Sequence, residues 1–222
     1  MNARAPLRLA ILISGRGSNM EAVARACRDG RINASVNVVI ADREGAGGLA
    51  VARELGIEAA VVSWKSFSDR AAFERALGDE IEAHRAEIIV LAGFMRVLSP
   101  EFANRYAGRL INIHPALLPR HRGLHTHRRA LEAGDTEHGA SVHFATAELD
   151  GGPVVLQSRI AVRTAETEND LAARVLATEH VILPKALGWL AEGRLEWRDG
   201  KGWLDGRALD APVVEEFPTA ER

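Results

Sequence analysis

The chain has 222 residues and a formal net charge of −2, and its hydrophobic share of 47% is enough to build a substantial core. A fold of this size buries roughly 70% of its unfolded surface, so no metal or disulfide is needed for stability. A single cysteine, Cys27, excludes an intrachain disulfide, and the interspersed acids and bases give no sign of a nucleic-acid surface. The apolar run Leu7–Ile13 is too short to span a bilayer, and no signal-peptide pattern follows it. We therefore expect a cytoplasmic protein that binds neither membranes nor nucleic acid.

The first half of the chain alternates strand and helix patterns. Short apolar runs predict strands at residues 7–13, 36–41, 59–62, 88–91 and 110–114. Helical spacing predicts helices from Met20 to Gly30, over residues 46–55, and after Ser68, which is a suitable N-cap. Strands that alternate with helices predict an α/β fold with a doubly wound, mostly parallel sheet and right-handed crossovers.

The second half of the chain has a different pattern. Residues 140–144 and 154–160 flank a turn and predict antiparallel strands that extend the sheet. A long helix is predicted from about Glu168 to Glu192, with a kink or break at Pro184. No repeat or linker interrupts residues 1–205, which we expect to form one domain, followed by a loosely packed tail over 206–222.

The segment Gly15–Asn19 follows the first strand and opens the first helix. Glycines there allow backbone N–H groups to approach a phosphate, and the helix N-terminus adds partial positive charge. A dinucleotide fingerprint requires glycine or alanine three positions after Gly17, where Met20 stands, so a small phosphate ester fits better than a nucleotide cofactor. The alternative interpretation is a plain turn in which Ser18 or Asn19 caps the helix.

Polar side chains end the fifth strand. Asn112 and His114 are two residues apart and face the same side, while Ile113 faces the other. Asp150 opens an Asp-Gly-Gly turn beyond a later strand, although aspartate before glycine is also common turn chemistry. An amide donor, an imidazole and a carboxylate are the groups that stabilise an oxyanion and move protons in acyl transfer. Because ligands bind outside the carboxyl ends of parallel strands, we expect the site in the loops at 14–19, 93–98 and 112–126.

Two further patterns have competing interpretations. Seven of the eight histidines lie between His114 and His180, so a zinc site that uses His125, His127 and Asp150 is an alternative. No HExxH or paired-cysteine spacing supports it, and we expect no metal. Glu179 interrupts an apolar helical line, where it either meets a cationic ligand group or lies at the helix margin.

Six segments, in this order, resemble the phosphoribosylglycinamide formyltransferases, folate-dependent enzymes of purine synthesis. They are ISGRGSN (Ile13–Asn19), LAGFMRVLSP (Leu91–Pro100), GRLINIHPALLP (Gly108–Pro119), GLHTHRRALEAGD (Gly123–Asp135), HGASVHF (His138–Phe144) and ELDGGPV (Glu148–Val154). The resemblance covers about residues 7–205. It implies a Rossmann-like formyltransferase fold, with a nucleotide-substrate half at about 1–110 and a folate and catalytic half at about 88–205.

The resemblance also implies a reaction and the residues that perform it. The formyl group of 10-formyltetrahydrofolate would pass to the amine of glycinamide ribonucleotide, in de novo purine (IMP) synthesis, by direct attack through an oxyanion tetrahedral intermediate. The positions that match the family's catalytic residues are Asn112, His114 and Asp150. Those that match its substrate-binding residues are Gly17, Ser18, Asn19 and Glu179. Those that match its folate-binding residues are Arg70, Met95, Arg96, Val97, Leu98, Asn112, Thr146, Ala147, Glu148, Leu149 and Asp150. The protein would work as a monomer or homodimer, without a metal.

The chain departs from the family's pattern in one loop. The family often has serine where Ala116 stands, and a Pro-Gly pair where this chain has Arg122-Gly123. The segment Pro119–Gly123 is similar to methionyl-tRNA formyltransferases, but the phosphate loop argues against a tRNA acceptor.

Two other functions stay open: a formyltetrahydrofolate hydrolase, which uses similar groups with water as acceptor, and a non-enzymatic phosphometabolite-binding module.

Overall fold

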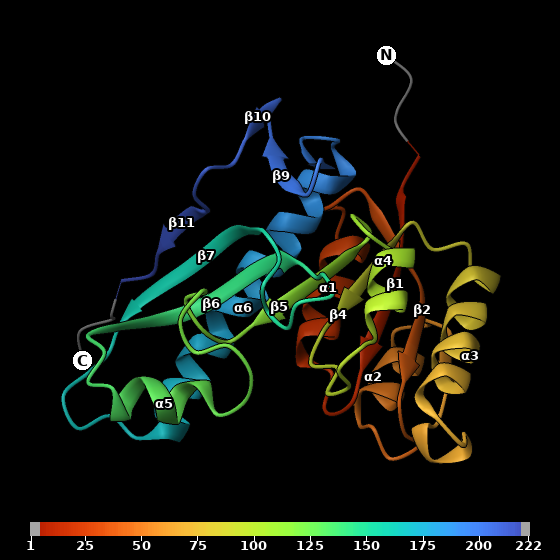
Figure 1. The fold of residues 1–222 in the computed structure, drawn as a ribbon, viewed down its shortest axis with the longest axis horizontal. Coiled ribbons are helices and arrows are strands. Elements are labelled where there is room, and N and C mark those ends of the chain that lie inside the picture. Colours follow the sequence, from red (N-terminus) through yellow and green to blue (C-terminus); the bar gives the residue numbers. More distant parts are fainter. Residues whose placement is uncertain (1–4, 219–222) are drawn as a thin grey trace.

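The structure, a computed structural model, describes residues 5–218 (Figure 1). The strands are β1 (Leu7–Ile13), β2 (Ala34–Ala41), β3 (Ala59–Val61), β4 (Ile88–Leu91), β5 (Leu110–His114), β6 (Glu137–Phe144), β7 (Val154–Ala161), β8 (Leu195–Arg198), β9 (Lys201–Leu204), β10 (Arg207–Ala208) and β11 (Val213–Glu216). The helices are α1 (Ser18–Arg28), α2 (Gly48–Glu54), α3 (Arg70–Ala83), α4 (Pro100–Arg105), α5 (Thr126–Glu132) and α6 (Glu168–Ala191), with a short 3₁₀ turn at Trp64–Ser66.

The described residues form an eight-stranded sheet in the order β11-β7-β6-β5-β4-β1-β2-β3, together with a three-stranded sheet in the order β10-β9-β8. Strands β1 to β5 pair in parallel, and β6 and β7 add the predicted antiparallel extension. Strand β1 lies between β2 and β4, so the chain reverses direction across the sheet at this point. The predicted α/β fold is confirmed, and the reversal gathers the ends of β1, β4 and β5 at one edge.

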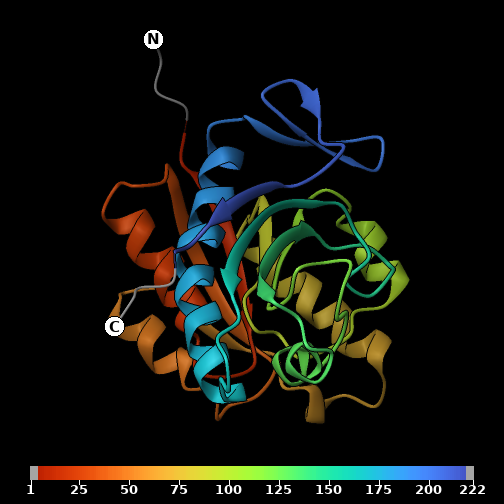
Figure 2. The same ribbon diagram turned by 90° about the vertical axis from the view of Figure 1, so that its left-hand side faces the viewer.

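The sheet is covered on both faces. One hydrophobic core contains Met20 of α1, Leu49 of α2 and Leu183 of α6, and the other contains Phe73 of α3 and Phe102 of α4. Figure 2 shows α6 running on the same side as α1. Strand β5 contributes to both cores: its odd-numbered residues belong to the first, and Leu110 belongs to the second. The predicted alternation along β5 is therefore confirmed, and it leaves Asn112 and His114 on the side of α3 and α4.

Several local features differ from the prediction. The cap of α3 is Asp69, whose carboxylate accepts the Ala72 N–H at 2.8 Å, while the hydroxyl of the predicted cap, Ser68, donates to Asp69 at 3.0 Å. Helix α6 runs unbroken through the buried Pro184. A proline costs a helix one hydrogen bond, and burial of this side chain and its neighbours offsets that cost. Helices α4 and α5 and the strands of the small sheet were not predicted.

The segment expected to form a loosely packed tail contributes two strands. Strand β10 pairs with β9, and β11 pairs in parallel with β7, with Val213 opposite Leu156. The Phe217 N–H then donates to the Arg159 carbonyl at 2.8 Å. The edge of the large sheet is thus extended by this segment, while the last four residues of the predicted tail lie outside the described range. No helix among residues 5–218 is long and apolar enough to cross a membrane.

Candidate active site

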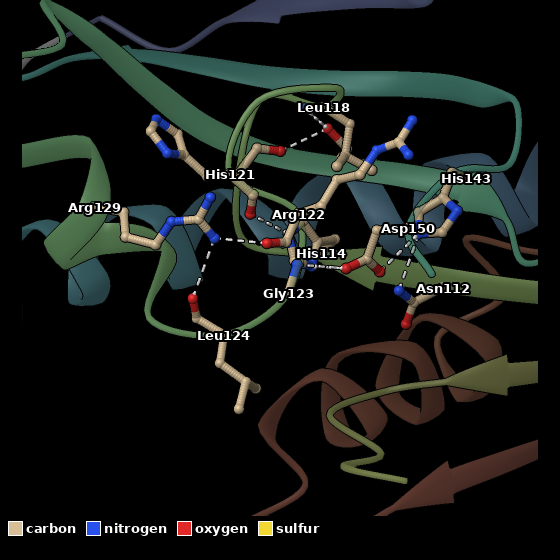
Figure 3. A network of polar contacts seen from close by, with 12 residues as sticks. Asn112, His114, Leu118, His121, Arg122, Gly123, Leu124, Arg129, His143 and Asp150 are labelled. Carbon is tan, nitrogen blue, oxygen red and sulfur yellow. Dashed lines mark hydrogen bonds and ion pairs between the residues drawn. The ribbon is translucent and has the colours of Figure 1, made fainter. Parts of the chain in front are cut away.

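The three predicted catalytic side chains converge at the end of β5 (Figure 3). Asn112 and His114 project from β5, and Asp150 projects from the turn between β6 and β7. The His114 Nδ1 atom lies 3.5 Å from Asp150 Oδ2, and the two side chains are 8% and 9% exposed. A carboxylate and an imidazole separated by 36 residues in sequence are therefore in direct contact and shielded from water.

Both ring nitrogens of His114 face oxygen atoms. Its Nε2 lies 3.0 Å from the His121 carbonyl oxygen, which can only accept a hydrogen bond, so we assign the hydrogen to Nε2. The other nitrogen then faces the Asp150 carboxylate. That carboxylate accepts a hydrogen bond when Nδ1 carries a hydrogen.

Asp150 is held from two directions. Its Oδ2 atom accepts the Gly123 N–H at 2.9 Å and lies 3.5 Å from His114 Nδ1. Its backbone has a left-handed φ of 49°, which is uncommon for a residue with a side chain. Such a conformation persists where the surroundings over-determine it, and it directs the carboxylate toward His114.

The Asn112 amide is oriented by His143, its partner across the β5–β6 pair. Asn112 Nδ2 lies 3.0 Å from His143 Nε2, and His143 Nδ1 lies 3.0 Å from the Phe144 carbonyl oxygen. The carbonyl fixes the hydrogen on Nδ1, so Nε2 accepts from the amide. Burial lowers the pKa of His143, which keeps this ring neutral. One of the two amide N–H groups of Asn112 is thus committed, and the other is available to a ligand.

An open cavity of about 110 Å³ adjoins Asn112 and Asp150. Nine of the predicted folate-binding residues line it: Arg96, Val97, Leu98, Asn112, Thr146, Ala147, Glu148, Leu149 and Asp150. Residues that were not predicted complete the wall: Leu91, Phe94, Ala103, Leu110, His143 and Ala145. The predicted residues Arg70 and Met95 do not line it; Arg70 is exposed at the start of α3, and Met95 is 61% exposed.

An ion pair between the predicted residue Arg96 and the buried Asp42, which was not predicted, anchors the loop at 93–98. Arg96 Nε donates to Asp42 Oδ2 at 2.6 Å, and its guanidinium lies 5.1 Å from the centre of the Trp64 ring. Burial opposes ionisation of Asp42, but hydrogen bonds from Arg43, Arg96 and Ser14 outweigh it and lower the pKa of Asp42. Asp42 could have been found from the sequence, because it is an acid directly after the apolar β2 strand.

The predicted phosphate loop lies at the start of α1. Gly17 has φ of 77°, and a Cβ atom there would lie 2.8 Å from Gly48 Cα, so only glycine fits. No side chain among residues 5–218 caps α1, which argues against the plain-cap interpretation and leaves the N–H groups of its first turn directed outward. The loop and the catalytic trio lie at the same edge of the sheet, because Leu12, Leu91 and Asn112 are register neighbours on β1, β4 and β5.

Glu179 of α6 contacts the same loop. Asn19 Nδ2 donates to Glu179 Oε2 at 2.5 Å, and both side chains are buried. Burial raises the pKa of Glu179, partly opposed by the Asn19 hydrogen bond. Asn19 Oδ1 is buried without a hydrogen-bond partner among residues 5–218. The helix-margin interpretation of Glu179 is therefore wrong, since the carboxyl lies under the start of α1.

The other histidines do not form the alternative zinc site. His127 Nδ1 lies 3.1 Å from His138 Nε2, and His125 is exposed. In the described part of the chain, no three His, Cys, Asp or Glu side chains are grouped as metal ligands would be.

Comparison with known proteins identifies the family. Residues 7–187 match the formyl transferase family. The phosphoribosylglycinamide formyltransferase of Escherichia coli is 48% identical over 203 residues, which cover 91% of this chain and 96% of that enzyme. The chain belongs to the phosphoribosylglycinamide formyltransferase family. The resemblance seen in the sequence is thereby confirmed.

Two further relatives of this family agree. The solved structure of the phosphoribosylglycinamide formyltransferase from Coxiella burnetii superposes with a TM-score of 0.90 at 42% identity, covering 94% of this chain and 99% of that chain. The trifunctional purine biosynthetic protein adenosine-3 of Drosophila melanogaster is 42% identical over 188 residues, which cover 84% of this chain and 14% of that protein. The formyltransferase fold thus also occurs as one part of a larger purine-synthesis protein.

Proposed function

We propose that this protein transfers the formyl group of 10-formyltetrahydrofolate to the amine of glycinamide ribonucleotide in purine synthesis. One observation carries the proposal: Asn112 and Asp150 line a cavity, and His114 contacts Asp150 directly behind its wall, at the sheet edge that also bears the Gly17–Asn19 loop. A folate and a phosphate ester could therefore meet at these side chains. Membership of the phosphoribosylglycinamide formyltransferase family supports this choice of substrates.

The folate would occupy the open cavity beside Asn112 and Asp150. Apolar side chains such as Leu91, Phe94 and Leu110 suit the flat faces of a pterin, and the loop at 146–150 supplies polar backbone groups at its edge. Arg70 and Met95, which lie outside the cavity, would contact the more distant part of the folate. The exposed Arg70 suits a carboxylate of the glutamate tail.

Glycinamide ribonucleotide would bind at the other half of the site. The N–H groups at Gly17, Ser18 and Asn19 suit its phosphate, because the N-terminus of α1 favours negative charge. The buried Glu179 carboxyl and the unpaired Asn19 Oδ1 are acceptors suited to hydroxyl or amine donors of the substrate. Residues 1–110 would form most of this half, and residues 88–205 would form the folate and catalytic half. Glu179 belongs to the second half but would contact the ribonucleotide.

The chemistry follows from the positions of the three catalytic groups. The neutral amine attacks the formyl carbon, and negative charge develops on the formyl oxygen. His114, when it is protonated during the reaction, and the free N–H of Asn112 stabilise that charge, and loss of one such group costs about 10²–10³ in rate. Asp150 accepts the amine proton, directly or through water, and the folate nitrogen is protonated as the carbon–nitrogen bond to it breaks. No metal takes part in this scheme.

The competing function is hydrolysis of 10-formyltetrahydrofolate, with water in place of the amine. The uncapped loop at Gly17 and the buried Asn19–Glu179 pair favour the transferase, because hydrolysis has no use for a phosphate site. A spectroscopic assay of tetrahydrofolate formation, with and without glycinamide ribonucleotide, tests the proposal. We expect turnover only with the ribonucleotide; equal turnover without it would identify a hydrolase, and no turnover in either case would identify a binding module.

A further inference from the structure

One short loop contacts both catalytic titratable groups through its backbone. The His121 carbonyl accepts from His114 Nε2 at 3.0 Å, and two residues later the Gly123 N–H donates to Asp150 Oδ2 at 2.9 Å (Figure 3). Backbone groups orient a ligand or side chain only as well as their own loop is held. The position of this loop therefore sets the position of the His114 ring and the Asp150 carboxylate.

The loop is anchored at Asp135, which lies in the turn between α5 and β6. Asp135 is buried, and each of its carboxylate oxygens contacts a loop side chain: Oδ1 pairs with Arg120, and Oδ2 lies 2.7 Å from His121 Nε2. The Asp135 N–H donates to the Ala130 carbonyl at 3.0 Å, which fixes the acid to the end of α5. The carboxylate is thus a rigid attachment point for two consecutive loop residues.

The two contacts of Asp135 are unequal. The Arg120 side chain is 57% exposed, and exposed ion pairs contribute little. The His121 side chain is 11% exposed, so its contact with Asp135 is shielded from water and more rigid. His121 is the residue that also supplies the carbonyl to His114.

The backbone of His121 connects these two contacts. Its φ of 54° is left-handed, and Figure 3 shows its ring pointing away from His114 while its carbonyl points toward it. This conformation is uncommon for a residue with a side chain. The contact with Asp135 on one side and the His114 hydrogen bond on the other hold it in place. Arg129 adds a second tether, since its Nη1 donates to the Arg122 carbonyl at 2.6 Å.

We infer that Asp135, acting through His121, is a positioning residue for the formyl transfer proposed above. It holds the His121 carbonyl against His114, which fixes a hydrogen on Nε2 and leaves Nδ1 as the nitrogen that exchanges its proton beside Asp150. Neither Asp135 nor His121 touches the substrates; both act on the orientation and tautomer of the catalytic imidazole. The inference rests on the proposed function for its effect on rate, but its effect on the His114 ring is independent of it.

The first test compares kcat and substrate affinity in matched variants. His121→Phe keeps a ring but cannot donate to Asp135, while His121→Gln retains a donor. We expect His121→Phe and Asp135→Ala to lower kcat about tenfold with the Kd of both substrates changed less than about twofold, because small misplacements of catalytic groups are costly. His121→Gln should recover most of the rate, and the exposed Arg120→Met should stay near wild type. An unchanged kcat in folded His121→Phe, or no recovery with His121→Gln, would overturn the inference.

The second test measures which nitrogen of the His114 ring carries the hydrogen, and it needs no assay of activity. In the full-length protein, the ¹⁵N shifts of its imidazole should show a hydrogen fixed on Nε2, and His121→Phe should shift the ring toward a mixture of tautomers. If the wild-type enzyme shows no formyl transfer but this shift is seen, the proposed function fails and the positioning relationship holds. If transfer occurs and the His114 signals are the same in both proteins, the positioning relationship fails. Should Asp135→Ala not fold, the two His121 variants decide the question.

Discussion

Asn112 and His143 face each other across the β5–β6 pair, with the Asn112 Nδ2 atom 3.0 Å from His143 Nε2. The neutral imidazole, fixed by the Phe144 carbonyl, is an acceptor that turns the amide of Asn112 in one direction. The oxyanion donor of the proposed reaction is therefore oriented by a buried histidine that is not itself a donor to substrate. This relationship has a measurable consequence.

Replacing His143 with leucine should lower kcat about tenfold, because the Asn112 amide loses its acceptor and rotates away from the formyl oxygen. Asn112→Ala should cost about 10²–10³, as for other oxyanion donors. The check is a double-mutant cycle on kcat: once Asn112 is alanine, His143→Leu should change the rate little further. Additive losses in the double variant would show that the two residues act separately.

Asp150→Asn should leave binding of both substrates nearly intact but lower kcat by at least about 10². The amide oxygen can still accept the Gly123 N–H, so the turn is retained, but the negative charge beside His114 Nδ1 is lost. Isothermal titration of each substrate together with steady-state kinetics separates the two effects. A change confined to KM would assign Asp150 to binding instead of proton transfer.

Gly17→Ala should weaken binding of glycinamide ribonucleotide at least about tenfold, because its φ of 77° and the 2.8 Å approach of Gly48 Cα both exclude a Cβ atom. The loop offers a matched control: a Cβ at Gly15 would meet nothing within 4 Å, so Gly15→Ala should bind like wild type. Titration with inorganic phosphate and with the ribonucleotide measures the effect. Equal affinities for the two variants would remove Gly17 from the phosphate site.

His138 should make the fold less stable in mild acid. Burial lowers the pKa of His138 from 6.5 to about 4, so the unfolded chain binds a proton at this residue before the folded protein does. The free energy of unfolding therefore falls as pH drops from 6.5 to 4, by at most about 3 kcal/mol from this residue. Burial also lowers the pKa values of His127, His143 and His180, which act in the same direction. Urea unfolding of wild type and His138→Asn across this pH range isolates the contribution of His138. If the free energy of unfolding changes with pH in the same way in both proteins, the prediction is contradicted.

The parts of the fold that follow local patterns were predictable from the sequence. The parallel strands are continuous apolar runs, and the spacing of Asn112 and His114 correctly put them on one face of β5. Features decided by tertiary packing were not predictable. Whether Ser68 or Asp69 caps α3 depends on one residue of register, and whether Pro184 breaks α6 depends on what packs around it.

The site was predictable where one loop or strand end carries it. The predicted phosphate loop is one contiguous segment, and the family resemblance, which rests on contiguous motifs, implied the cavity residues at 96–98 and 146–150. The supporting residues were missed because they come from distant segments. The His121–Asp135 contact depends on a loop conformation, and the Asp42–Arg96 pair joins positions 54 residues apart. Nothing in the local spacing of these residues indicates that they meet.

The most direct test of the central claim, that Asn112, His114 and Asp150 act on one formyl group, is the single-turnover rate of formyl transfer by His114→Ala. With both substrates bound at saturating concentration, the rate should fall about 10²–10³ while their Kd values stay within about threefold of wild type. A single-turnover rate within about twofold of wild type would contradict the claim.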